Sequence, residues 1–101
     1  MGKLVLTRKA GESVIVTEPN GATWRLKLEA MAGPSLLSWL IDYNVVLITK
    51  DGQSREFKLR MGESLTFAGG SVELRHHRRN GQLAMAFDHP RDVEIWREEL
   101  V

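Results

Sequence analysis

Hydrophobic and polar residues alternate along most of the chain, and a period of two is typical of β-strands with one buried face. The clearest case is Thr23 to Glu29, where Trp24, Leu26 and Leu28 share one face and charged side chains occupy the other. Similar short runs, rich in β-branched residues, recur between turn-forming residues. The strands that this pattern predicts are 3–8, 13–17, 23–29, 45–50, 56–60, 65–67, 72–77, 83–87 and 93–97.

Turn-forming residues separate these runs. Asp51-Gly52 predicts a two-residue hairpin that joins 45–50 to 56–60, and Glu18-Pro19-Asn20-Gly21 ends an earlier strand. Segment 35–43 fits either a strand or a short helical turn. About ten short strands, with turn signals roughly every 8–12 residues, predict an all-β sandwich or barrel with little or no helix.

One short motif occurs twice. Gly11-Glu12-Ser13 returns as Gly62-Glu63-Ser64, and each copy follows an apolar strand with basic residues and precedes another short apolar strand. Two interpretations stay open at this point: an internal duplication, or a common turn that the chain uses twice by coincidence.

Length and composition narrow the class of protein. A chain of 101 residues predicts a single domain, 1–101, and the 43% of hydrophobic residues are enough to build a core. No apolar run approaches the roughly 18 residues that span a bilayer, and we expect no signal peptide. The absence of cysteine excludes disulfides and thiol chemistry, which fits a reducing, cytoplasmic location.

Charge gives a local signal but no global one. The formal net charge is only +1, so attraction to nucleic acid must come from where the basic residues lie. They cluster at 7–9 and 75–79, with Arg91 and Arg97 near the end of the chain. A solvated turn produces clusters of the same kind, so the clusters alone do not decide the function.

The two ends of the chain resemble a known family. The stretch LVLTRKAGESVIV at 4–16, together with NGQLAMAFDHPRDVEIWREEL at 80–100, is similar to the carbon storage regulator (CsrA/RsmA) family of small bacterial RNA-binding regulators of translation. An ordinary member is about half this long and works as a dimer of five-stranded subunits that interleave their strands. The resemblance therefore implies an interleaved β-sheet sandwich or barrel.

The length of the chain suggests how the resemblance is distributed. Residues 54–101 can be read as one full copy and 3–50 as a degenerate copy, with 45–50 as its fifth strand and Lys50 at the place of Arg97. The implied molecule is a dimer fused into one chain, a monomeric pseudo-dimer. A rival layout treats 18–69 as an insertion, and such a protein needs a partner chain as a homodimer.

In the family, RNA lies between the first strand of one subunit and the fifth strand of the other, and the preferred target is a GGA triplet in a hairpin loop. The resemblance implies that one wall consists of Leu6, Thr7, Arg8 and Lys9, and the other of His89, Pro90, Arg91, Ile95, Trp96 and Arg97. A weaker second RNA site would contain Lys50, Lys58 and Arg60.

The chemistry of these residues supports the same expectation. Arg offers planar, charge-assisted bonds to phosphates and guanine edges, so Arg97 is the expected anchor. Without the resemblance, a surface ion pair with Asp92, Glu98 or Glu99 is the favoured role of Arg97, and with the resemblance RNA contact is favoured. Trp96 either stacks on a base or belongs to the core. Ile95 faces the opposite way, so only one of the two points inward.

The sequence therefore predicts a sequence-selective RNA-binding protein that occupies an mRNA leader or a small RNA and modulates translation, with a protein antagonist as a further partner. The alternative is a degraded protein-interaction module that pairs with or antagonises a genuine regulator without binding RNA. We expect neither an enzyme nor a bound cofactor. His76 and His77 point to opposite faces of a strand, so we expect no metal site there.

Overall fold

The structure of the chain is a computed structural model that describes residues 2–30, 43–76 and 82–98. These residues form strands and turns, and within them no helix is long and apolar enough to cross a membrane. The strands are β1 (Gly2–Arg8), β2 (Ser13–Thr17), β3 (Thr23–Ala30), β4 (Asn44–Lys50), β5 (Gln53–Leu59), β6 (Ser64–Phe67), β7 (Gly70–His76), β8 (Leu83–His89) and β9 (Glu94–Arg97).

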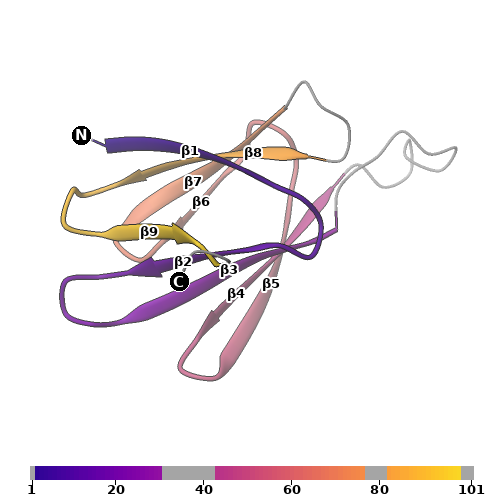
Figure 1. Cartoon of the computed structure of the whole chain (residues 1–101). Coiled ribbons are helices and arrows are strands. Elements are labelled where there is room, and N and C mark those ends of the chain that lie inside the picture. Colours follow the sequence, from indigo (N-terminus) through magenta and orange to yellow (C-terminus); the bar gives the residue numbers. More distant parts are fainter. Residues whose placement is uncertain (1, 31–42, 77–81, 99–101) are drawn as a thin grey trace, which may run out of the picture.

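The strands form two antiparallel sheets. The first has the order β1-β8-β7-β6, and the second has the order β5-β4-β3-β2-β9. Figure 1 shows the two sheets as layers, with β1 and β8 above β9 and β2. The all-β class expected from the alternation is confirmed.

Most strands lie where the alternation predicts them. The Asp51-Gly52 hairpin is confirmed, with both residues at positive φ, although its second strand already begins at Gln53 because the pairing runs up to the turn. The strand or helical turn expected at 35–43 lies outside the described residues except for Tyr43, which is not in a strand.

The core fills the space between the two sheets, because each strand turns its apolar face inward. Burying one such Leu, Val or Phe side chain contributes about 1.5–3 kcal/mol. The buried core residues are Val14, Val16, Leu26, Leu28, Val46, Ile48, Leu59, Phe67, Ala68, Val72, Leu74, Leu83, Met85 and Phe87.

The two Gly-Glu-Ser motifs are the turns at which the chain crosses between the sheets. One connects β1 to β2 and the other connects β5 to β6. Gly11 and Gly62 both have left-handed φ values, 93° and 86°, which L side chains rarely adopt. The Gly11 amide donates to the carbonyl of Leu28 (2.6 Å), and the Gly62 amide donates to that of Leu74 (2.8 Å).

The glutamates close the same two turns. The Oε1 atom of Glu12 accepts a hydrogen bond from the Lys9 amide (2.7 Å), and that of Glu63 accepts one from the Arg60 amide (2.6 Å). Glycine therefore supplies the backbone conformation, and glutamate satisfies an amide that the turn leaves without a ladder partner. This explains why the chain uses the motif at both crossings.

Four strands of one sheet have counterparts in the other. When the order β1-β8-β7-β6 is set beside β5-β4-β3-β2, β1 corresponds to β5, β8 to β4, β7 to β3 and β6 to β2. The strands that precede the two crossing turns, β1 and β5, therefore correspond, and so do the strands that follow them, β2 and β6. We call strands at the same place counterparts. Only β9 has no counterpart in the described part of the chain.

This pairing differs from the expected fused layout in the place of residues 45–50. Residues 45–50 belong to β4, which lies between β3 and β5 and is the counterpart of β8, so Lys50 does not stand at the place of Arg97. The strands within residues 18–69 take part in both sheets. Alternation finds a strand but does not say which strands flank it.

Gly70 begins β7, and its backbone lies close to the end of β8. A Cβ at this position collides with the carbonyl oxygen of Asp88 and the ring of His89. We expect Gly70→Ala to lower the free energy of unfolding by about 1–3 kcal/mol, as overpacking does. Urea denaturation measures this, and Ser71→Ala, which changes it by less than about 0.5 kcal/mol, is the control. Equal effects of the two variants contradict the close approach.

Candidate nucleic-acid interface

The two strands that the sequence selects for RNA binding are both edge strands. β1 ends one sheet and β9 ends the other. β8 ends at His89, which pairs with Gly2 of β1. The turn that follows leads to β9, and the Val93 amide closes it by donating to the carbonyl oxygen of Pro90 (3.0 Å). In Figure 1, β1 and β9 lie on the same side of the molecule and run in the same direction. Their outer edges therefore border a common surface.

The structure brings Arg8 and Arg97 to the same end of β2. The Nη1 atom of Arg8 donates to the carbonyl oxygen of Ser13 (3.3 Å), and Arg97 is the ladder partner of Val14, the next residue. Arg8 and Arg97 thus both contact or pair with β2 at neighbouring residues, although they are 89 positions apart in the chain (97 minus 8).

Arg8 itself is not a surface residue. Only 3% of it is exposed, and its guanidinium also donates from Nε to the Thr7 carbonyl (2.7 Å), with Glu12 3.9 Å away. The side chain points inward because it follows Leu6 at the period of two. Leu59 holds the same place in β5 and is also buried. In this structure Arg8 ties β1 to β2 and does not present its charge to solvent.

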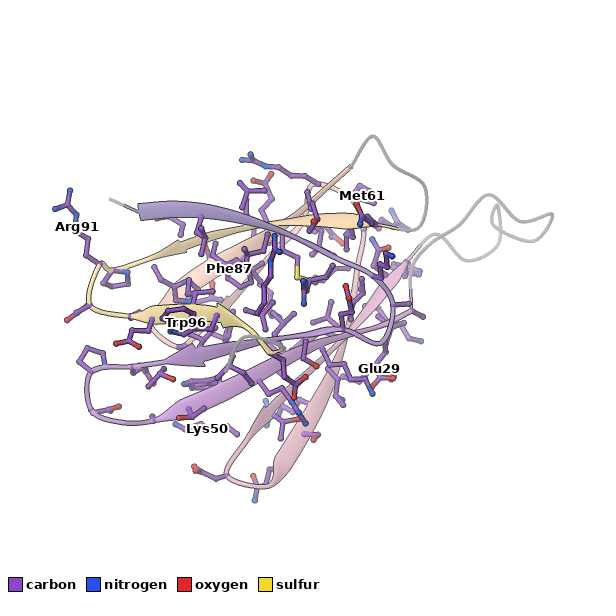
Figure 2. All side chains as sticks on the ribbon, viewed as in Figure 1. Glu29, Lys50, Met61, Phe87, Arg91 and Trp96 are labelled. Atoms are coloured by element: carbon purple, nitrogen blue, oxygen red, sulfur yellow. The ribbon has the colours of Figure 1, made fainter. Side chains whose placement is uncertain are left out.

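Exposed apolar side chains gather on the two edge strands. The large hydrophobic residues that are exposed in the described chain are Leu4 (39%), Val5 (50%) and Trp96 (48%). Ile95 packs against the core, so the alternation puts Trp96 outside, as Figure 2 shows on β9. Exposed apolar groups on sheet edges favour a binding surface, since an unprotected edge otherwise invites aggregation.

Three cations accompany these side chains. Lys9 and Arg91 are exposed and Arg97 is half-buried, and no described carboxylate forms an ion pair with any of them. Arg91 extends into solvent from the turn after β8 (Figure 2). Glu98, an expected partner of Arg97, instead pairs with Arg25 on β3. Consecutive side chains of a strand point to opposite faces, so these residues surround the two edge strands and do not form a flat patch. We use the name β1–β9 face for this edge of the molecule, with Leu4, Val5, Lys9, Arg91, Trp96 and Arg97.

His89 does not belong to this face, although the resemblance implied that it does. It is 4% exposed, its Nε2 lies 3.0 Å from the carbonyl oxygen of Phe67, and the two rings meet edge to face with centroids 5.2 Å apart. The strand continues beyond its expected end at Phe87, and the alternation turns His89 inward. The remaining members of the two walls are accessible in different degrees: Pro90 is exposed, and Leu6 and Thr7 are half-buried.

The residues of the expected second site do not come together. Lys50 pairs with Gln53 at one end of the β4–β5 hairpin, whereas Lys58 pairs with Val45, which is about 17 Å further along the strands. Arg60 lies beyond Lys58, at the end of the hairpin away from Lys50. Its guanidinium donates to the hydroxyl of Tyr43 (3.0 Å) and lies over that ring. The expected second site is therefore not assembled in this structure, because β4 lies between β3 and β5 and its Lys50 is at the other end of the hairpin from Lys58 and Arg60.

Sequence reasoning missed a cavity of about 490 Å³ at the opposite edges of the sheets, between β5 and β6. No residue type marks it in advance. It depends on which strand ends each sheet, and strand order is a tertiary property. Its lining consists of Trp24, Ile48, Lys50, Asp51, Gln53, Arg55, Phe57, Thr66 and Phe67.

Comparison with known proteins gives no assignment: no protein-family model, curated protein or solved structure matches the chain.

The burial of Arg8 predicts a structural role that can be measured. Arg8→Ala removes the bonds to the carbonyl oxygens of Thr7 and Ser13, so we expect the free energy of unfolding to fall by about 1–3 kcal/mol in urea denaturation. Lys9→Ala, one position away and exposed, is the control and changes it by less than about 0.5 kcal/mol. If Arg8→Ala leaves stability unchanged, its guanidinium is available to a ligand.

Proposed function

We propose that the protein is a sequence-selective RNA-binding regulator of translation of the carbon storage regulator type, and that it binds RNA on the β1–β9 face. The observation that carries the proposal is the exposed Trp96 on β9 together with Lys9, Arg91 and Arg97, which form no ion pair within the described residues. A stacking surface beside cations and free backbone groups is what single-stranded loops require.

Each part of the face has a separate role in the proposed complex. Trp96 stacks on an unpaired base, which contributes about 1–3 kcal/mol. Lys9 and Arg91 contact phosphates at the margins, while Arg97 makes paired bonds to a guanine edge or a phosphate. The outer edges of β1 and β9 offer amide and carbonyl groups to the base edges of a GGA loop. Such a protein blocks a message when the loop lies near a ribosome-binding site.

We further infer that the chain arose by duplication and fusion. The support is the shared geometry of the two crossing turns and the matching order of four strands in each sheet. In this interpretation a single chain supplies both halves of an interleaved pair and acts as a monomer. Because β9 has no described counterpart, one chain carries one RNA surface, where an ordinary pair of subunits carries two.

Titration of a labelled RNA hairpin with a GGA loop tests the proposal. We expect Arg97→Ala to weaken binding by about 1–3 kcal/mol, and Arg97→Lys to recover only part of it because Lys lacks the bidentate fork. Trp96→Ala should cost a similar amount, while Trp96→Phe keeps a stacking ring. Affinity should fall with salt according to the number of phosphate contacts.

Two controls make the result interpretable. Lys58→Ala removes an exposed cation from β5, on the other edge of the sheet, and should leave affinity unchanged. A hairpin with a CCA loop in place of GGA measures the sequence-independent part of the affinity. Absence of binding at low salt, or equal affinity of the wild-type chain and the Arg97→Ala and Trp96→Ala variants, would reject the proposal in favour of a protein-interaction module.

A further inference from the structure

The cavity between β5 and β6 lies beside the outer edge of β6, where a fifth strand would give the four-stranded sheet the same number of strands as its partner. On the other side of the molecule, β9 pairs with β2 and covers the core there, with Ile95 packed inward. The counterpart of β2 is β6, and within the described residues no strand pairs with the outer edge of β6. The cavity therefore occupies the place that β9 fills in the other half.

The connection after β4 explains why no described strand occupies this place. β8 is followed by a turn at 90–93 and then by β9, which crosses to the other sheet. Its counterpart β4 is followed by the two-residue turn Asp51-Gly52 and directly by β5. No residues remain between these strands that can form a counterpart of β9.

The open edge of β6 carries backbone groups for one more strand. Phe67 and Gly70 flank the two-residue turn at Ala68-Gly69 and form the first pair of the β6–β7 ladder. Since hydrogen-bonded pairs alternate along an antiparallel ladder, the amide and carbonyl groups of Thr66 and Ser64 point away from β7. They face the cavity side, where Thr66 is part of the lining.

The lining combines an apolar floor with two cations, Lys50 and Arg55, and one carboxylate, Asp51. The apolar floor consists of Ile48, Phe57 and Phe67. An inward-facing side chain of an added strand would pack against them. Lys50 and Arg55 stand at the rim, and within the described residues neither forms an ion pair. With two cations against the single carboxylate of Asp51, the charged groups of the lining sum to a positive charge, which favours an acidic ligand.

We propose that this groove binds an extended, acidic segment of a partner protein, which pairs with β6 as an added antiparallel strand and places an apolar side chain on the floor. Recognition by strand addition uses main-chain bonds for affinity and alternate side chains for specificity. The proposal does not rest on RNA binding, because it concerns the opposite edges of the two sheets.

The aromatic residues of the cavity favour a peptide over a nucleic acid. Lys50 covers the face of the Trp24 ring, with its Nζ 4.5 Å from the centroid, and the indole Nε1 donates to Glu18 (2.8 Å). Phe67 is only 6% exposed and meets Trp24 edge to face. Lys50 occupies one face of Trp24 and Phe67 is buried, which disfavours base stacking on these two rings, whereas the β6 edge offers a row of backbone groups.

A fluorescein-labelled synthetic peptide with the sequence of residues 92–98 is the probe, because it is acidic and its strand already adopts the required pairing with β2. Fluorescence anisotropy with the full chain should show saturable binding. Changing Val93 and Ile95 of the peptide to serine should weaken binding at least about tenfold, since the apolar contacts with the floor are lost.

Variants of the chain locate the binding. Thr66→Pro removes an outward amide at an edge position that tolerates proline and should weaken binding at least about tenfold, while Thr66→Val keeps the amide and the affinity. Lys50→Gln and Arg55→Gln should each weaken it about three- to tenfold, and Lys58→Gln, on β5 outside the groove, should not. If Thr66→Pro unfolds, as circular dichroism would show, the two charge variants decide.

The opposing outcomes are distinct. The proposal is overturned if the peptide shows no saturable binding. It is also overturned if the affinity for the peptide is unchanged by the substitutions at Thr66, Lys50 and Arg55. A single-stranded RNA that binds with the same dependence on Lys50 and Arg55, in the absence of peptide binding, also overturns it. Loss of hairpin binding through Trp96 and Arg97 would leave this result untouched, so failure here and failure of the RNA proposal can be told apart.

Discussion

The pairing of β9 with β2 is the constraint on which the rest of the molecule depends. It joins the last strand of the chain to one near its beginning, and it adds a fifth strand to a sheet that otherwise has the same order as its partner. Because β1 belongs to the other sheet, this pairing sets two edges from remote parts of the chain beside one surface. The same pairing closes the core on this side, through Ile95.

The three crossings between the sheets make this pairing possible. The chain changes sheet after β1, after β5 and after β8, so each sheet contains strands from both halves of the sequence. Two of the crossings use the Gly-Glu-Ser turn, in which a left-handed glycine and a glutamate that accepts an amide bond hold the corner. An interleaved fold of this kind requires long-range pairing, and its halves have no separate cores.

The alternation of residues predicted the strands but not their neighbours. The period of two placed Ile95 and Trp96 on opposite faces, and the Asp51-Gly52 turn identified its hairpin, because both are local properties. Arg8 and His89 also follow the period of two, but their burial at the ends of β1 and β8 further depends on which residues cover those ends, which the alternation does not show. For the same reason the cavity beside β6 had no signal in the sequence. The two edges of the sandwich thus differ: β9 covers one, and within the described residues no strand covers the groove at the other.

The most direct test of this account is to map RNA onto the folded chain by NMR, with the ¹⁵N-labelled protein and the GGA hairpin. The account predicts that amide shifts concentrate in residues 4–9 and 91–97, with β5 and β6 unchanged, and that they saturate at one RNA per chain. Shifts that concentrate on β5 and β6, or that stay absent on β9 while the RNA binds, would contradict it.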